Sequence, residues 1–207
     1  MESRKSFEAR LKYKMAPHLI GLVMDAYNFS KYGHRGQFRD SSERYFEHPR
    51  RVAIISIDEL RIYDHEAIVA ALLHDIEEDS YILSWDRIQK DFGDRVLAFV
   101  KLLTKKPGQS LEEYLANLQK AEEIVQLLKL ADRLDNIRDL KGCTEAKSKK
   151  QLKETAERFI PWAKKLGDES MRGKEPGTPW TPQYALYSAL KVAYAEQYSR
   201  IYNPTGT

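Results

Sequence analysis

The sequence predicts an all-α fold, and two observations support this expectation. Apolar residues recur every three or four positions through most of the chain, which is the period of an amphipathic helix, and almost no stretch alternates between apolar and polar residues as a strand would. With 207 residues, the chain is long enough to bury a sizeable core within one domain. We therefore expect a bundle of about eight to ten helices.

Composition and charge argue against several classes of protein. Hydrophobic residues make up 42% of the chain and charged residues 31%, and the formal charge of +3 comes from scattered Lys and Arg rather than a basic stripe suited to nucleic acid. Cys143 is the single cysteine, so no internal disulfide can form. The N-terminus lacks an apolar signal segment, and no run of about 18 apolar residues could span a membrane. We expect a cytoplasmic protein.

The first part of the chain begins with a basic, weakly patterned lead-in at residues 1–15, which we expect to be frayed or lightly docked. Pro17 then begins a core helix. Residues 34–48 lose the helical period, and their aromatic side chains indicate a structured loop rather than a linker. We place Pro49 at the first position of the next helix, so His48 is expected to extend from the loop.

Polar residues with cap chemistry mark the helix starts that follow. Asp64 is an N-cap candidate for the helix that runs into residues 70–80, Ser84 is one for the next helix, and Ser110 with Glu113 matches a capping box.

The last third of the chain contains two further predicted helices. Residues 147–165 form an amphipathic pattern that Pro161 should kink, and residues 167–182 are rich in Gly and Pro, which indicates a loop. The final helix is expected to start at Thr181 and to end at Asn203.

The segment AALLHDIEEDS at residues 70–80 joins an apolar helical run to a cluster of ionisable side chains. On a helix, His74 and Glu78 lie one turn apart, as do Asp75 and Asp79, so their donor atoms converge at one end of one face. Buried carboxylates are tolerated when they are paired or bind a metal, and an imidazole beside a carboxylate is a ligand pair that divalent metals accept. The alternative is a helix end whose acidic residues face solvent.

Polar residues also share one arc of the helix predicted at residues 122–140. Its apolar residues cover most of the circumference, so the helix should be largely buried, yet one narrow stripe carries Asp132, Asp135, Asn136 and Asp139. Carboxylates on a buried stripe repel one another and are costly to desolvate, so a cation is expected to face them. The alternative is that the stripe is the solvated face of the helix.

Four residues from separated parts of the chain could form a metal site: His48, His74, Asp75 and Asp132. Two imidazoles and two carboxylates suit a borderline divalent ion such as Mn²⁺ and leave positions open for water and substrate. Glu78 and Asp79 would remain as carboxylates that orient or deprotonate the water. Spacing alone does not establish this assignment.

Three segments of the chain are similar, in order and spacing, to successive motifs of one family. They are HRGQFRDSSERYFEHPRRVA, AALLHDIEEDS and LLKLADRLDNIRDL. Over residues 20–165 the chain resembles the HD-superfamily hydrolase domain of RelA/SpoT homologues. The HxGQxR…Y…HP loop, the HDxxED extension and the ADRLxNxR helix are specific to that branch. The resemblance implies an HD-domain helical bundle with a structured loop at its metal site.

The resemblance also implies a reaction and assigns roles to residues. Hydrolases of this family remove the 3′-pyrophosphate from hyperphosphorylated guanosine nucleotides such as ppGpp, giving GDP or GTP and pyrophosphate, with one Mn²⁺ ion. The implied metal ligands are the four residues named above. Glu78 and Asp79 are implied to activate the water, whereas Arg39 and Asn136 are implied to contact the nucleotide.

Several positions depart from the family pattern. Asp40 and Asp135 stand where the family commonly has a lysine and a histidine, and we assign Arg44 to substrate binding because it could restore a cation nearby. An anion beside the nucleotide should change base or phosphate preference rather than metal binding, so adenosine analogues stay open as substrates. Tyr45 is expected to pack the loop, and His34 to be a structural or surface residue.

Other functions and the domain organisation stay open on the sequence alone. A phosphohydrolase acting on dNTPs, nucleoside monophosphates or NADPH would use the same ligands, and a nucleotide sensor would be expected to lose a ligand or the Glu-Asp pair, which this chain retains. The resemblance is to a stand-alone small alarmone hydrolase with one domain at residues 16–207. Its extension at residues 166–207 could close the core or a homodimer contact, and functional pairing with an alarmone synthetase is a further expectation.

Overall fold

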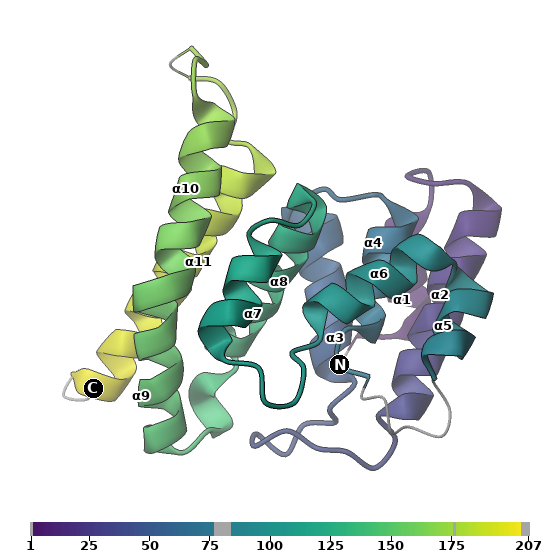
Figure 1. Ribbon diagram of the computed structural model, residues 1–207, viewed down its shortest axis with the longest axis horizontal. Coiled ribbons are helices and arrows are strands. Elements are labelled where there is room, and N and C mark those ends of the chain that lie inside the picture. The colour runs from purple at the N-terminus through teal and green to yellow at the C-terminus, as the bar shows by residue number, and fades with distance from the viewer. Residues whose placement is uncertain (1, 77–83, 176, 204–207) are drawn as a thin grey trace. The chain divides into compact units, whose positions relative to one another are not determined.

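The computed structural model describes residues 2–76, 84–175 and 177–203. The regular elements within these ranges are helices, as the sequence predicts (Figure 1). The chain divides into two compact units, Met1–Gln37 with Arg44–Lys129, and Phe38–Glu43 with Leu130–Thr207. The expectation of a single domain at residues 16–207 stays a prediction. None of the helices in the described ranges combines the length and apolar character that a membrane crossing requires.

The first unit contains helices α1 (Arg4–Leu11), α2 (Pro17–Gly33), α3 (Glu47–Ile54), α4 (His65–Leu73), α5 (Trp85–Phe92), α6 (Asp94–Leu103) and α7 (Leu111–Leu118), with a π-helical turn, η1 (Ile55–Glu59), after α3. Helix α4 lies at its centre, because it packs against α2, α3 and α6 and buries every side chain from Ala67 to Leu73. The caps expected from the sequence are present: Asp64 accepts hydrogen bonds at the start of α4, Ser84 caps α5, and Ser110 forms the capping box of α7. Helix α8 (Glu123–Arg138) continues from this unit into the second.

The N-terminal segment is docked on the first unit. Of the two expectations for it, fraying is wrong, and the docking is firmer than the light contact we expected. Ser3 caps α1 by accepting a hydrogen bond from the Ser6 N–H at 3.0 Å, and α1 packs against α2. Phe7 and Leu11 are fully buried. The weak apolar pattern of the segment contains only these two inward positions, which is why it does not predict a packed helix.

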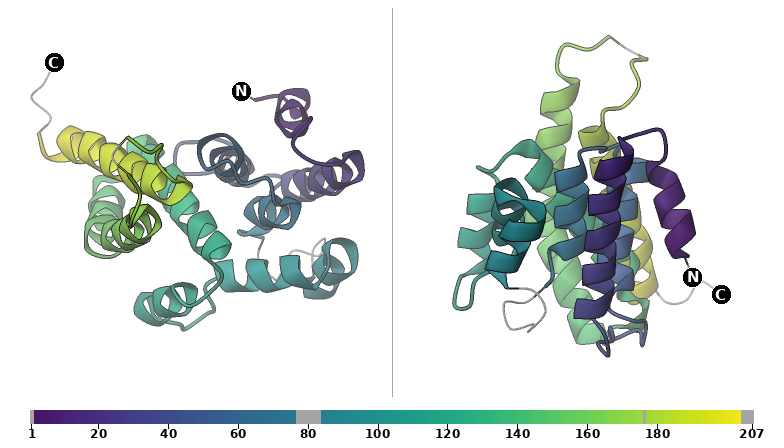
Figure 2. Two further views of the ribbon diagram at one scale, coloured as in Figure 1. Left: turned by 90° about the horizontal axis from the view of Figure 1, so that it is seen from above. Right: turned by 90° about the vertical axis from the view of Figure 1, so that its right-hand side faces the viewer.

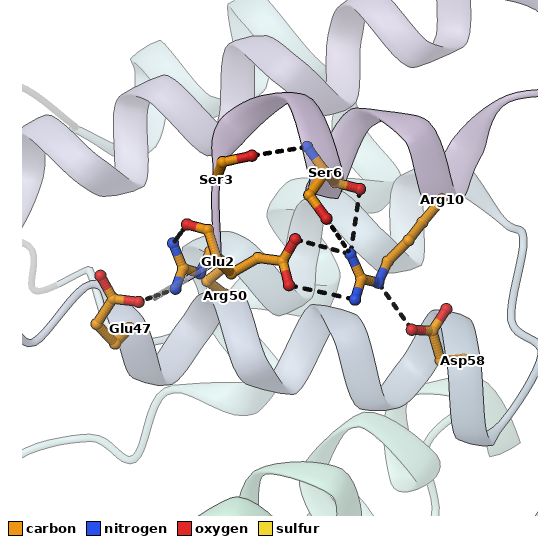
Figure 3. Close-up of polar contacts among 7 residues, drawn as sticks. All are labelled: Glu2, Ser3, Ser6, Arg10, Glu47, Arg50 and Asp58. Carbon is orange, nitrogen blue, oxygen red and sulfur yellow. Dashed lines mark hydrogen bonds and ion pairs between the residues drawn. The ribbon is translucent and has the colours of Figure 1, made fainter.

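A cluster of charged residues fastens this segment to α3 and η1 (Figure 3), and we call it the N-terminal anchor: Glu2, Arg10, Glu47, Arg50 and Asp58. Arg10 donates to both carboxylate oxygens of Glu2, at 2.9 and 3.2 Å, and to Asp58 at 2.7 Å. Arg50 donates to the Glu2 carbonyl oxygen at 2.6 Å and pairs with the buried Glu47 carboxylate. The anchor therefore joins the N-terminus to the helix that carries His48.

Two predicted helix boundaries beside the candidate site are wrong by a few residues. Helix α3 begins at Glu47, so His48 lies in its first turn rather than in the loop, and Pro49 is tolerated there because the first four N–H groups of a helix have no intrahelical partner. Helix α4 ends at Leu73, and the described residues that follow it, 74–76, are not helical. The Ala71 carbonyl, which a longer helix would use for the Asp75 N–H, accepts a hydrogen bond from the His74 side chain at 2.7 Å.

The second unit is built mainly from η2 (Leu140–Gly142), α9 (Glu145–Glu154), η3 (Thr155–Phe159), α10 (Ile160–Met171) and α11 (Pro182–Tyr202). Helices α10 and α11 lie side by side (Figure 2). The α-helix is interrupted before Pro161 by the π-helical turn η3, and Pro161 lies at the start of α10, because proline cannot donate the hydrogen bond that continues an α-helix.

The loop predicted at residues 167–182 is shorter than expected, because α10 continues to Met171. Gly167 lies inside α10, where a Cβ atom would be 3.2 Å from the Cα atom of Tyr184 on α11. This glycine permits close helix packing and is not a helix end. Helix α11 starts after Thr181 and ends before Asn203, as predicted.

Candidate metal centre

Three of the four predicted metal ligands lie together in the first unit. The Nε2 atom of His48 is 3.3 Å from Oδ2 of Asp75, and Nε2 of His74 is 3.4 Å from Oδ1 of the same carboxylate. One ligand atom from each of the three residues lies within 4.8 Å of the others. Helix α3 supplies His48 from its first turn, and His74 and Asp75 follow directly after the last residue of α4.

The backbone fixes how His74 presents its ring. Its Nδ1 atom is 2.7 Å from the Ala71 carbonyl oxygen. A carbonyl oxygen can only accept, so Nδ1 carries the hydrogen and Nε2 retains a lone pair on the side of Asp75. A backbone carbonyl bound to one imidazole nitrogen is the usual arrangement for a histidine whose other nitrogen binds a metal.

Tyr45 belongs to this cluster, although the sequence predicts only that it packs the loop. Its hydroxyl donates to Oδ2 of Asp75 at 2.9 Å, and its ring meets the His48 ring edge to face at a centroid distance of 6.2 Å. The hydrogen bond orients the carboxylate. The sequence offered one sign of this role, because Tyr45 lies three residues before His48. Its contact with Asp75, however, spans 30 residues, and no local pattern predicts such a contact.

The donor set fits a divalent transition-metal ion. Two imidazole nitrogens and a carboxylate are preferred by borderline ions, and ligand atoms bound about 2.1 Å from one ion lie roughly 3–4 Å apart. The separations of 3.3 and 3.4 Å agree with this requirement. Both histidines are buried, which removes competing solvent from the ring nitrogens.

The predicted fourth ligand, Asp132, lies in the second unit, where it belongs to a network that we call the loop clamp: Arg39, Asp132, Asn136 and Asp139. Asn136 donates to Oδ1 of Asp132 at 2.6 Å and accepts from Arg39 at 2.8 Å. Arg39 also pairs with Asp139 at 2.7 Å. The clamp thus fastens the loop at residues 38–43 to the acidic stripe of α8 and its continuation.

The acidic stripe of α8 is not its solvated face. Asp132 is 5% exposed and Asp135 is 2% exposed, so this alternative is wrong. The loop also packs tightly on η2, since a Cβ atom at Gly142 would lie 2.2 Å from the Cα atom of Ser41.

The residues that depart from the family pattern have partners. Asp40 pairs with Lys147 of α9 at 2.7 Å, and the Lys147 ammonium group lowers the pKa of the Asp40 carboxyl below its usual value by hydrogen bonding and by charge. Arg44 donates to Glu47 at 2.6 Å in the first unit. The predicted water-activating pair, Glu78 and Asp79, lies outside the described residues.

Known proteins similar to this chain show its family and agree with its fold. The family profile described as "HD domain" matches residues 26–168. The chain is 38% identical over 188 residues to the guanosine-3′,5′-bis(diphosphate) 3′-pyrophosphohydrolase of Aquifex aeolicus, covering 87% of this chain and 25% of that protein. It is 37% identical over 151 residues to the protein of the same name from Haemophilus influenzae, covering 68% and 22%. The chain therefore spans about a quarter of the length of these relatives.

The solved structure of a protein described as a metazoan ortholog of SpoT that hydrolyzes ppGpp is also similar. The two structures superpose with a TM-score of 0.62 at 28% sequence identity, covering 85% of this chain and 95% of that one. The profile match includes His48, His74, Asp75 and Asp132, and it extends over more than half of the chain. The chain therefore belongs to the HD-domain family.

Proposed function

We propose that this protein is a metal-dependent hydrolase that removes pyrophosphate from the ribose 3′ position of hyperphosphorylated guanosine nucleotides such as ppGpp. The observation that carries the proposal is the convergence of His48, His74 and Asp75. The names of the Aquifex and Haemophilus relatives support the substrate class.

The proposed cofactor is one Mn²⁺ ion per chain, held by His48, His74 and Asp75 with Asp132 as the fourth ligand. When bound, such an ion offsets the negative charge of the pyrophosphate group and makes a nearby water molecule easier to deprotonate. The donor set supports a borderline divalent ion, and the resemblance to RelA/SpoT homologues favours manganese among such ions.

The chain's own residues hold the proposed ligands in place. The Ala71 carbonyl fixes the His74 ring, and the Tyr45 hydroxyl orients the Asp75 carboxylate. In the second unit, the Asn136 carboxamide orients Asp132. Each of these partners limits rotation of a ligand, which is the usual contribution of residues around a metal site.

The remaining roles follow from the family motifs. We propose that Glu78 and Asp79 orient the attacking water and take its proton, and that Arg39, Arg44 and Asn136 bind the substrate. Arg39 is already paired with Asp139 on the loop clamp, so a phosphate group would share its guanidinium with that carboxylate. Arg44 would similarly share its charge with Glu47.

The proposed setting is the cytoplasm, with the hydrolase acting opposite an alarmone synthetase. A homodimer is the assembly that we would test, by light scattering of the purified protein.

Release of pyrophosphate tests the proposed reaction. The purified protein with Mn²⁺ is incubated separately with ppGpp, pppGpp, ppApp, NADPH and a dNTP, and a chelated sample is the control. Pyrophosphate from ppGpp or pppGpp that disappears with the chelator supports the proposal. Release of phosphate groups only from NADPH or the dNTP would instead identify another phosphohydrolase of the same family, and no release from any nucleotide would favour a sensor.

A further inference from the structure

His34 is a buried histidine that the proposed reaction does not use. It caps the C-terminus of α2 and is 5% exposed. Its Nδ1 atom is 2.8 Å from Oε1 of Gln37. The backbone makes this contact possible, because the Gln37 N–H binds the His34 carbonyl across a tight turn in which Gly36 adopts a φ of +81°.

The contact with Gln37 fixes the tautomer of His34. A carboxamide oxygen accepts hydrogen bonds, so Nδ1 carries the hydrogen and Nε2 has a lone pair. Nε2 is buried and has no hydrogen-bond partner among the residues that the structure describes. Most buried polar atoms in proteins have a partner, either a protein group or an ordered water. We therefore expect Nε2 to have a partner beyond the described residues, and an ordered water is one group that could fill this role.

His34 packs on Tyr45, the residue whose hydroxyl binds the proposed ligand Asp75. The centroids of the two rings lie 4.8 Å apart, and their planes are inclined by 31°. His34 is close enough to Asp75, His74 and His48 to interact electrostatically with each of them. However, the ligand atoms that converge within 4.8 Å of one another come from those three residues and not from His34, which places its imidazole outside the ligand sphere.

Burial lowers the pKa of the His34 imidazole below its usual value, and the Gln37 contact opposes this effect. The geometry of the Gln37 contact, rather than this shift, leaves Nε2 as the acceptor.

We propose that His34 is a positioning residue of the metal centre, whose Nε2 accepts a hydrogen bond from a water molecule held beside His48, His74 and Asp75. Each of three residues in the HRGQ segment then has its own role, since Gly36 forms the turn, Gln37 fixes the tautomer, and His34 holds the water. The inference rests on the metal centre of the proposed function, but it does not depend on which nucleotide is the substrate.

Two substitutions at His34 distinguish the effect of losing the hydrogen-bond acceptor at Nε2 from the effect of losing the volume of the ring. In His34→Gln the side-chain oxygen can reach the position of Nε2, whereas in His34→Asn a polar atom remains only at the position of Nδ1. We expect the affinity for Mn²⁺, measured by calorimetric titration of the full chain with the metal alone, to fall about 10- to 100-fold in His34→Asn and to stay close to wild type in His34→Gln. His18→Gln, which removes an exposed histidine from the other end of α2, is the matched control and should change nothing.

Circular dichroism and the unfolding midpoint accompany each titration. Wild-type Mn²⁺ affinity in His34→Asn overturns the inference. Equal loss of affinity in both variants overturns it as well, since the acceptor would then not be the feature that matters. A wild-type protein that binds neither Mn²⁺ nor another divalent ion would overturn the proposed metal centre itself, which is a different result.

Discussion

The N-terminal anchor and the loop clamp are both built on ion pairs between arginine and carboxylate groups, but they connect different parts of the protein. In each, an arginine binds a carboxylate that lies far from it in the sequence: Arg10 binds Asp58 as well as Glu2, and Arg39 binds Asp139. The anchor fastens one helix to another. The clamp continues through Asn136 to Asp132, a proposed metal ligand. We therefore expect an ion pair to affect the reaction only where its hydrogen-bond network includes a proposed metal ligand.

Because of this difference, we expect substitutions in the anchor and in the clamp to change different properties of the protein. Weakening the anchor should lower the free energy of unfolding and leave turnover unchanged at temperatures where the protein is folded. Weakening the clamp should change metal binding or turnover more than stability.

The largest effect is expected at the proposed metal ligands, namely Asp132 of the loop clamp and the cluster of His48, His74 and Asp75. Asp132→Asn and His74→Ala should each reduce turnover by about a thousandfold or more, because the first removes the charge of a proposed ligand and the second removes a proposed ligand altogether. Pyrophosphate release and Mn²⁺ titration measure the loss, with circular dichroism to verify the fold. Asp135→Asn is the matched control, as it removes an equally buried carboxylate of α8 that is not a proposed ligand. If Asp135→Asn lost as much activity as Asp132→Asn, the ligand assignment would be wrong.

The next largest effect is expected at Asn136, the residue of the clamp that binds Asp132. Asn136→Ala removes the hydrogen bond to Asp132 and the acceptor for Arg39, and we expect kcat and Mn²⁺ affinity to fall about 10- to 100-fold. A rise in KM with unchanged Mn²⁺ affinity would show that Asn136 acts on the nucleotide alone. That outcome would remove the clamp from the metal centre and weaken the contrast with the anchor.

Asp40 tests whether the loop held by the clamp selects the base. Asp40→Lys reverses a charge that Lys147 now offsets, so we expect the ratio of rates on ppGpp and ppApp to change by roughly threefold, the effect of one exposed charge pair. Lys147→Gln, which breaks the same pair without a new cation at residue 40, is the control. An unchanged ratio in Asp40→Lys would exclude this residue from base selection.

Much of the fold could be predicted because its signals are local. The caps at Asp64, Ser84 and Ser110 depend on backbone N–H groups two or three residues away, and the sequence displays them directly. The docking of α1 could not be predicted, since Arg10 meets Asp58 across 48 residues. The end of α4 was missed because a hydrogen bond from the His74 side chain replaces a backbone one, and the residue pattern alone gives no sign of this.

The residues of the candidate site also differ in how well the sequence predicts them. The motif resemblance led to His48, His74 and Asp75, which the structure brings together. It gave no role to Tyr45 or His34, whose positions depend on a turn at Gly36 and on packing between distant segments.

Arg10→Gln is the direct test of the anchor. It removes the two hydrogen bonds to Glu2 and the one to Asp58, and because the Arg10 side chain is about a quarter exposed we expect a loss of about 1 kcal/mol in the free energy of unfolding. Urea unfolding measures this loss, and kcat at low temperature should equal that of the wild type. A fall in kcat without a change in stability would mean that the anchor also acts on His48 through α3.

The smallest effect is expected at the start of α4, where Arg95 binds Asp64 as the anchor and clamp arginines bind their carboxylates. Burial raises the pKa of Asp64, but hydrogen bonds from Arg95 and from the N–H groups of Glu66 and Ala67 outweigh it, so the pKa lies below its usual value. The folded state therefore takes up this proton at lower pH than the unfolded state. The stabilisation is complete above the unfolded pKa of about 4 and is lost as pH falls through the folded value.

Asp64→Asn keeps the cap but removes the charge, so it isolates this contribution. We expect the variant to be less stable than the wild type by about 0.5–1 kcal/mol at pH 7, with the gap closing toward pH 2. Asp86→Asn, at an exposed position in the first turn of α5, is the matched control. A gap that stays constant down to pH 2 in urea unfolding would mean that the charge of Asp64 contributes nothing. The contacts between Arg95 and residue 64 would then stabilise α4 by hydrogen bonding without a contribution from charge. For Arg10, in contrast, we expect charge to contribute.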